Sequence, residues 1–141
     1  MTNRSPSFKN KTIAALLASI GGCLGLYRFY LGGRRDIWAW LHFACLPLSL
    51  LLYFSQATAQ PFFAFAPLIL STLGGFLACL IIGTMSDEKW DALFNPDEAR
   101  KSDTNWPMAL ILVFTLGIGA GSLIAVIARS FDLLLTGGMY G

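Results

Sequence analysis

The sequence predicts an all-α protein, an integral membrane bundle of four transmembrane helices whose first two form a hairpin. Of its 141 residues, 55% are hydrophobic and 13% are charged, whereas a soluble domain carries about 25% charged residues. Four apolar stretches follow one another, at 12–27, 37–54, 62–83 and 108–128. Because hydrocarbon offers backbone amides no partners, such stretches are helices rather than strands of an open sheet.

The first stretch is short, because a membrane-spanning helix needs about 20 residues. It spans the bilayer if the helix continues through Phe29 and Tyr30, or if Arg28 reaches up to the headgroups. Aromatic side chains beside one cation are typical of an anchor at headgroup depth. Gly32 and Gly33 then supply the positive φ angles that a tight turn into the second helix needs.

Two prolines, Pro47 and Pro67, fall inside the second and third stretches. Proline removes a backbone donor and kinks a helix. We favour a packing kink over a hinge or gate, because prolines are frequent in membrane helices. The stretches at 62–83 and 108–128 contain no Asp, Glu, Lys or Arg, which argues against a proton-coupled transporter because such a protein needs an ionisable relay in the membrane.

The segment 84–107 is the one sizeable polar connection, and we expect it to lie at the membrane surface as two short helices. The first covers 87–94 and has Trp90, Leu93 and Phe94 on one face at helical spacing. Asn95 is expected to cap the second, because a proline and two acidic residues follow it.

The residue types needed for catalysis or metal binding do not occur together in a usable pattern. The acidic cluster at 87–91 is expected to be a solvated helix face, because calcium needs six or more oxygens in a defined loop. His42 is the only histidine, and we favour a structural hydrogen bond over a haem ligand. A lipid-modified Cys23 is disfavoured, because the helical pattern continues across the sequence that resembles a cleavage site. We therefore expect no enzyme, no metal and no cofactor.

A run of residues in the first hairpin matches a known signature: Lys11, Gly22, Gly25, Arg28, Phe29, Tyr30, Leu31 and Gly32. On these positions, residues 9–54 resemble the TM-two domain family, in which two membrane helices flank a short Arg-Phe-Tyr-Leu-Gly loop. The resemblance covers about a third of the chain and implies a membrane hairpin with a cytoplasmic loop and no established reaction. Tyr27 stands where the family usually has Asp or His, so the arginine lacks its polar partner there. Arg28 is either an interfacial anchor or a ligand for a lipid phosphate or a partner's carboxylate.

Small residues recur every four positions on three helices, which lets helix backbones approach closely inside lipid. The stripes are Ala14, Ala18 and Gly22; Ser71, Gly75, Cys79 and Gly83; and Gly117, Gly121 and Ala125. We expect two of the three to be used in packing within the chain. The fourth helix, through Gly117 and Gly121, is the predicted interface.

These features divide the chain into a polar tail (1–8), the hairpin (9–54), a second helix pair (55–128) with its surface segment (84–107), and a C-terminal tail (129–141). More Lys and Arg residues fall in the first and third loops than in the terminal segments, which favours cytoplasmic loops. The basic N-terminal tail argues the other way, because with four spans it would lie on the opposite side.

We expect a non-enzymatic multi-pass protein of the cell membrane, with a bacterial inner membrane as its predicted location. Its partners would be the lipid bilayer and either a membrane protein or further copies of the chain. With a net charge of +2 and no dense basic stripe, nucleic acid is not an expected partner. The predicted role is an interaction or accessory subunit. The alternative is a small homo-oligomeric channel or transporter whose pore is lined by Ser71, Thr72, Thr115 and Ser122.

Overall fold

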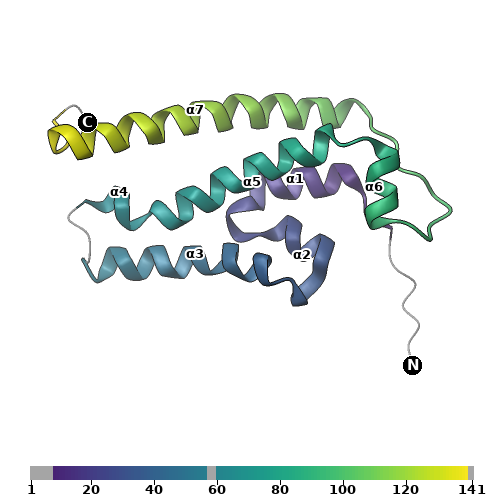
Figure 1. Cartoon of the computed structure of the whole chain (residues 1–141), viewed down its shortest axis with the longest axis horizontal. Coiled ribbons are helices and arrows are strands. Elements are labelled where there is room, and N and C mark those ends of the chain that lie inside the picture. The colour runs from purple at the N-terminus through teal and green to yellow at the C-terminus, as the bar shows by residue number, and fades with distance from the viewer. Residues whose placement is uncertain (1–7, 57–59, 140–141) are drawn as a thin grey trace.

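The computed structural model describes residues 8–56 and 60–139, and these residues form helices without a β-strand (Figure 1). In chain order the elements are α1 (Lys11–Gly21), η1 (Gly22–Leu24), α2 (Leu26–Gly32), η2 (Gly33–Arg35), α3 (Ile37–Phe54), α4 (Pro61–Ala64), α5 (Ala66–Thr84), α6 (Asp87–Phe94) and α7 (Trp106–Thr136). The helices α3, α5 and α7 are long and apolar enough to cross a membrane. The all-helical class is confirmed, with three helices of membrane-spanning length instead of four.

The first apolar stretch is not a single helix, and its prediction as a membrane span is not confirmed. The helix α1 ends at Gly21, and Gly25 takes a left-handed conformation (φ +68°) that reverses the chain into α2. A residue without a Cβ adopts that conformation at little cost. The Tyr30 hydroxyl then accepts a hydrogen bond from the Asn10 amide at 2.9 Å, so α2 returns to the end at which α1 began. We call this unit the α1–α2 hairpin.

The hairpin is packed against α5, which lies at the centre of the molecule (Figure 1). Ala14, Ala15 and Ala18 of α1 are fully buried. At the tip of the hairpin, a Cβ built on Gly22 would lie 2.4 Å from the Cα of Gly75, so the two backbones are in direct contact. The stripe of small residues predicted on α1 therefore serves packing within the chain.

The third apolar stretch is divided into α4 and α5 by a break at Phe65. Pro61 opens α4, and Pro67 stands in the first turn of α5 instead of inside a helix, which corrects its predicted position. The Ser49 hydroxyl of α3 accepts a hydrogen bond from the Leu68 amide at 3.2 Å and so satisfies a donor at the start of α5. Pro47 does lie inside α3, as expected.

The polar segment contains one short helix, α6, whose bounds agree with the prediction. Trp90 is fully buried and its ring centroid lies 4.3 Å from that of Phe94, but Leu93 is 58% exposed and does not share their face. The second predicted helix does not form. Asn95 bonds through its side chain to Lys9 and Asp91 instead of capping a new helix.

The last helix is longer than predicted, because α7 continues through the expected C-terminal tail to Thr136. Its 31 residues measure about 46 Å at the usual rise of 1.5 Å per residue, compared with about 30 Å of hydrocarbon. An ion pair of 2.6 Å between Arg129 and Asp132, one turn apart, supports the final turns. Of the expected N-terminal tail, 1–8, all but Phe8 lies outside the described residues.

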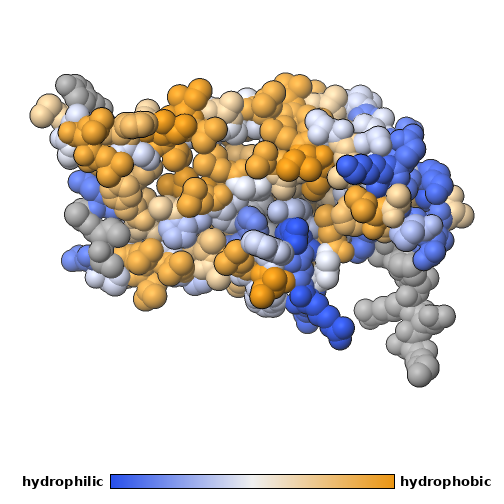
Figure 2. All heavy atoms as spheres, in the orientation of Figure 1, coloured by the Kyte–Doolittle hydropathy of each residue, from blue (hydrophilic) through white to orange (hydrophobic). Residues whose placement is uncertain are grey.

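Figure 2 shows hydrophobic side chains over the bodies of the helices and a concentration of hydrophilic ones at the α6 end. The exposed apolar residues lie mainly on α3, α5 and α7, including Leu51, Leu70 and Phe114. An apolar surface of this kind suits contact with lipid acyl chains and not with water.

We predict that Gly75→Ala destabilises the fold by about 3 kcal/mol, at the upper end for over-packing a core. The added Cβ would meet the Gly22 Cα at 2.5 Å, and backbone moves aside less easily than a side chain. Thermal unfolding in detergent, followed by circular dichroism, measures the effect. The matched control is Gly117→Ala, because no atom lies within 4 Å of that Cβ position. Equal melting temperatures for the two variants would contradict the close approach.

Candidate functional site

The signature arginine finds its carboxylate partner in a residue that the sequence analysis did not single out. Arg28 lies on α2, and Asp36 is the N-cap of α3. Their Nε and Oδ2 atoms are 2.9 Å apart, and Nη2 donates a hydrogen bond of 3.1 Å to Oδ1. The Nε contact is ionic, because this buried N–H does not point along a hydrogen-bond direction. Asp36 is thus the carboxylate partner of Arg28 within the chain.

The same carboxylate joins the turn to the next helix. Asp36 Oδ1 also accepts the Trp38 amide at 2.9 Å, which caps α3. Burial would raise the pKa of the Asp36 carboxyl, but the hydrogen bonds from Arg28 and Trp38 outweigh it and hold that pKa below its ordinary value. Arg28 is therefore largely neutralised within the chain, which favours an anchoring role over an external ligand.

The remaining signature residues shape this turn. A Cβ on Gly32 would lie 2.8 Å from Asp36 Oδ2, so glycine leaves room for the ion pair. The Phe29 ring meets Trp40 edge to face at 5.3 Å. The Tyr30 carbonyl accepts a hydrogen bond of 2.7 Å from Lys9 Nζ. Of the two glycines expected to take positive φ, only the second, at 33, does so.

His42 makes the structural hydrogen bond that the sequence analysis favoured. Its Nδ1 atom lies 2.6 Å from Ser71 Oγ, and that hydroxyl donates to the Cys23 carbonyl at 2.8 Å. Because the single hydroxyl proton goes to the carbonyl, His42 Nδ1 must be the donor in the first bond. The contact fastens the tip of the hairpin to α3 and α5.

A cluster of polar side chains, which the sequence analysis missed, holds the start of α1 against α6 and the loop that follows it. We call it the polar cluster; its members are Lys9, Lys11, Asp87, Asp91, Asn95, Ser102 and Thr104. Lys11 is only 5% exposed, and its Nζ donates to the Met85 carbonyl, to Asp87 Oδ1 at 2.9 Å and to Thr104 Oγ1 at 3.0 Å. Burial would raise the pKa of Asp87, but hydrogen bonds from Thr104 and Lys11 lower it below its ordinary value.

The second carboxylate of the polar cluster, Asp91, is buried, so the expectation of a solvated acidic face is wrong there, although Glu88 is exposed as expected. It accepts hydrogen bonds from Asn95 Nδ2 at 3.0 Å and from the Ser102 amide and hydroxyl at 2.8 and 2.6 Å. These bonds lower the pKa of Asp91 from 3.8 to about 2. The Lys9 carbonyl in turn accepts from Trp90 Nε1 at 2.9 Å.

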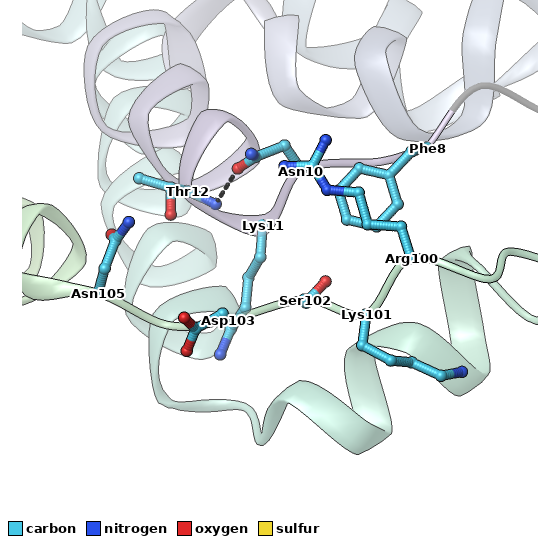
Figure 3. A pocket seen from close by; sticks show the side chains of 9 residues that line it. All are labelled: Phe8, Asn10, Lys11, Thr12, Arg100, Lys101, Ser102, Asp103 and Asn105. Carbon is cyan, nitrogen blue, oxygen red and sulfur yellow. Dashed lines mark hydrogen bonds between the residues drawn. The ribbon is translucent and has the colours of Figure 1, made fainter.

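A polar cavity of about 220 Å³ lies beside the polar cluster and is the subject of Figure 3. Arg100 reaches over the Phe8 ring, with 4.7 Å between its guanidinium carbon and the ring centroid, while Lys101 extends away from it. Lys11 also lines this cavity, but its ammonium is occupied by Asp87. Among the described residues, no group of three or more His, Cys, Asp or Glu side chains could hold a metal ion.

Two of the three glycines in α7, Gly117 and Gly121, face away from the rest of the described chain. A Cβ on Gly117 or Gly121 would have no atom within 4 Å, whereas one on Gly119 would meet Phe76 at 3.4 Å. The stripes of α1 and α5 are used in internal packing, at Gly22 against Gly75 and at Gly83 against Leu112. The α7 stripe is thus the one without an internal partner.

The hydroxyls proposed to line a pore are mostly engaged inside the molecule. Thr115 is buried and lies 2.7 Å from the Ser19 hydroxyl, and Ser71 bonds to Cys23. The Thr72 hydroxyl donates to the Leu68 carbonyl of its own helix.

No protein-family model, curated protein or solved structure matches the chain. The resemblance of residues 9–54 to the TM-two domain family therefore stays a prediction.

We predict that Lys11→Met lowers the free energy of unfolding by about 3 kcal/mol. This is the low end for removing one partner of a buried ion pair, because water reaches Asp87, which is 25% exposed. Chemical or thermal unfolding in detergent measures the loss. Lys89→Met, an exposed lysine on α6, is the control and should change stability by less than about 0.5 kcal/mol. A similar loss in both variants would argue against a structural role for the ion pair.

Acidification should destabilise the protein through Asp91. Because its pKa in the fold is below that of an unfolded chain, its stabilising effect is complete above about pH 4 and is lost as the pH falls toward about 2. We expect the melting temperature to decline over that range, and less steeply in Asp91→Asn, which keeps the size but cannot titrate. Parallel declines in the two proteins would show that Asp91 is not responsible.

Proposed function

We propose that the chain is a non-enzymatic integral membrane protein that acts as an accessory subunit and docks a membrane-embedded partner protein on the outer face of α7. We call this surface the glycine face; it comprises Gly117, Gly121 and the exposed Ala125. The observation that carries the proposal is the open space beside both glycines, in a chain whose other small-residue stripes are filled.

The chemistry of the bilayer explains why such a face suits a protein. Lipid tails are as apolar as leucine, so burying apolar side chains gives membrane helices little reason to associate. Close backbone approach at small residues allows extensive van der Waals packing instead. Leu110 and Val113 continue the glycine face toward the α6 end and are exposed, which extends the surface that a partner helix could contact.

We further propose that the α6 end faces the cytoplasm of a bacterial cell. The α1–α2 hairpin starts and finishes at that end, so Lys9 and Lys11 lie with the turn before α3 and the segment between α5 and α7 (Figure 1). All described Lys and Arg residues except Arg129 then belong to one side, and the positive-inside rule favours that side as cytoplasmic. Lys9 and Lys11 thus no longer argue against this orientation, which agrees with the cytoplasmic loop that the TM-two resemblance implies.

The alternative, a homo-oligomeric channel, has less support because the Ser71, Thr72 and Thr115 hydroxyls that would line its pore are hydrogen bonded inside the chain. The glycine face could nevertheless pair with a second copy. The composition of the native particle distinguishes the two.

We predict that Gly121→Leu weakens partner binding by at least about tenfold, equivalent to about 1.4 kcal/mol, because the new side chain separates the helices. The chain is purified from its native membrane in mild detergent, and the intact particle and its components are weighed by native mass spectrometry. Loss of a stoichiometric second protein from the variant supports the proposal.

The control is Leu123→Trp, which enlarges an exposed α7 residue about half a turn around the helix from Gly121 and should keep the partner. Both variants should melt like the wild type, because position 121 has open space around it. A wild-type particle made of this chain alone would favour self-association, and retention of the partner by Gly121→Leu would contradict the proposed docking face.

A further inference from the structure

Two adjacent arginines stand exposed where the chain enters α3. Arg34 and Arg35 form the short helix η2 with Gly33, and neither side chain makes an ion pair or hydrogen bond within the described residues. The turn that carries them has Asp36 as its single carboxylate, and Arg28 already occupies it. The turn therefore presents an excess of positive charge. Figure 2 shows hydrophilic residues next to hydrophobic ones at the lower edge of the molecule, where η2 lies in Figure 1.

The length of α3 indicates that the arginines lie at the depth of the lipid headgroups. The helix α3 has 18 residues and measures about 27 Å, so it just crosses about 30 Å of hydrocarbon and must begin at the membrane boundary. Ile37 and Trp38, directly after η2, are 77% and 58% exposed, as expected for side chains that contact lipid. Indole rings favour this interfacial layer.

Aromatic packing fixes the turn in place. The Trp40 ring packs edge to face on Phe29 at 5.3 Å and on Phe43 at 5.8 Å. Its Nε1 donates a hydrogen bond of 2.8 Å to the Arg34 carbonyl. The backbone under the two guanidinium groups is thus held by the ring stack, while the groups themselves are free to meet a ligand.

We propose that Arg34, Arg35 and the exposed Trp38 bind the phosphate of an anionic phospholipid. A guanidinium presents a planar set of donors that matches phosphate oxygens, and the neighbouring indole accommodates the glycerol and upper acyl region. An anionic headgroup complements the charge excess of the turn, whereas a zwitterionic headgroup brings its own cation. The proposal shares only the membrane setting with the proposed function, because the glycine face of α7 takes no part in it.

The test is a lipid titration of the purified full-length chain in mild detergent, followed by native mass spectrometry. The probes are phosphatidylglycerol and phosphatidylcholine with identical acyl chains. The wild type should bind phosphatidylglycerol more tightly. Arg34→Gln should weaken that binding roughly fivefold, and Arg34→Gln with Arg35→Gln roughly 25-fold, from about 1 kcal/mol for each basic residue at the surface.

A matched double variant, Arg100→Gln with Lys101→Gln, removes the same charge from the loop at the same end of the molecule and should keep the preference within about twofold. Thermal melting of the Arg34 and Arg35 double variant should equal that of the wild type. Gly121→Leu should retain the lipid preference, which separates this proposal from the docking face on α7.

Three results would overturn the proposal. The wild type could bind both lipids equally, or the Arg34 and Arg35 double variant could keep its preference. An equal loss in the Arg100 and Lys101 control would indicate a diffuse surface potential instead of a site.

Discussion

The contact between Gly22 and Gly75 is the constraint on which the rest of the structure depends. Each glycine occupies the place where a side chain on the other would stand, so α1 can pack against α5 only because both positions lack a Cβ. This contact ends α1 near the middle of α5, and the left-handed Gly25 turns the chain back. A segment with the composition of a membrane span therefore becomes a hairpin that begins and finishes at one end of the molecule.

The polar cluster follows from that arrangement. With α1 packed among α5, α6 and α7, Lys11 is buried, and a buried ammonium is tolerated only with a charged partner and further acceptors. Asp87, Thr104 and the Met85 carbonyl provide them. The polar segment that seemed to be a solvated connection is thus a cap on the hairpin, and the same end of the molecule gathers the basic residues.

Sequence patterns predicted the elements whose causes are local. The helix α3 was located by its apolar run and α6 by apolar residues at helical spacing. The outward Gly117 and Gly121 were located by their stripe. The α1–α2 hairpin was not predicted, because Gly22 and Gly25 fit the small-residue pattern of a continuous packed helix as well as a break between two helices. The polar cluster was not predicted, because nothing near Lys11 in the sequence identifies Asp87 as its partner. The ion pair of Arg28 was not predicted, because Asp36 had been assigned only to a turn.

The sequence separation of the polar cluster has a consequence for synthesis of the protein. Lys9 bonds to Asn95 and Lys11 to Thr104, across 86 and 93 residues. A chain emerging from the ribosome cannot complete these bonds until residues after α6 are available, although α1 is made first. The helix that is made first, α1, is therefore among the last to gain its polar contacts. Until then, Lys11 has to remain in water or with a temporary partner. Folding of this protein must therefore accommodate a first helix whose polar contacts can form only after the segment between α5 and α7 has been made.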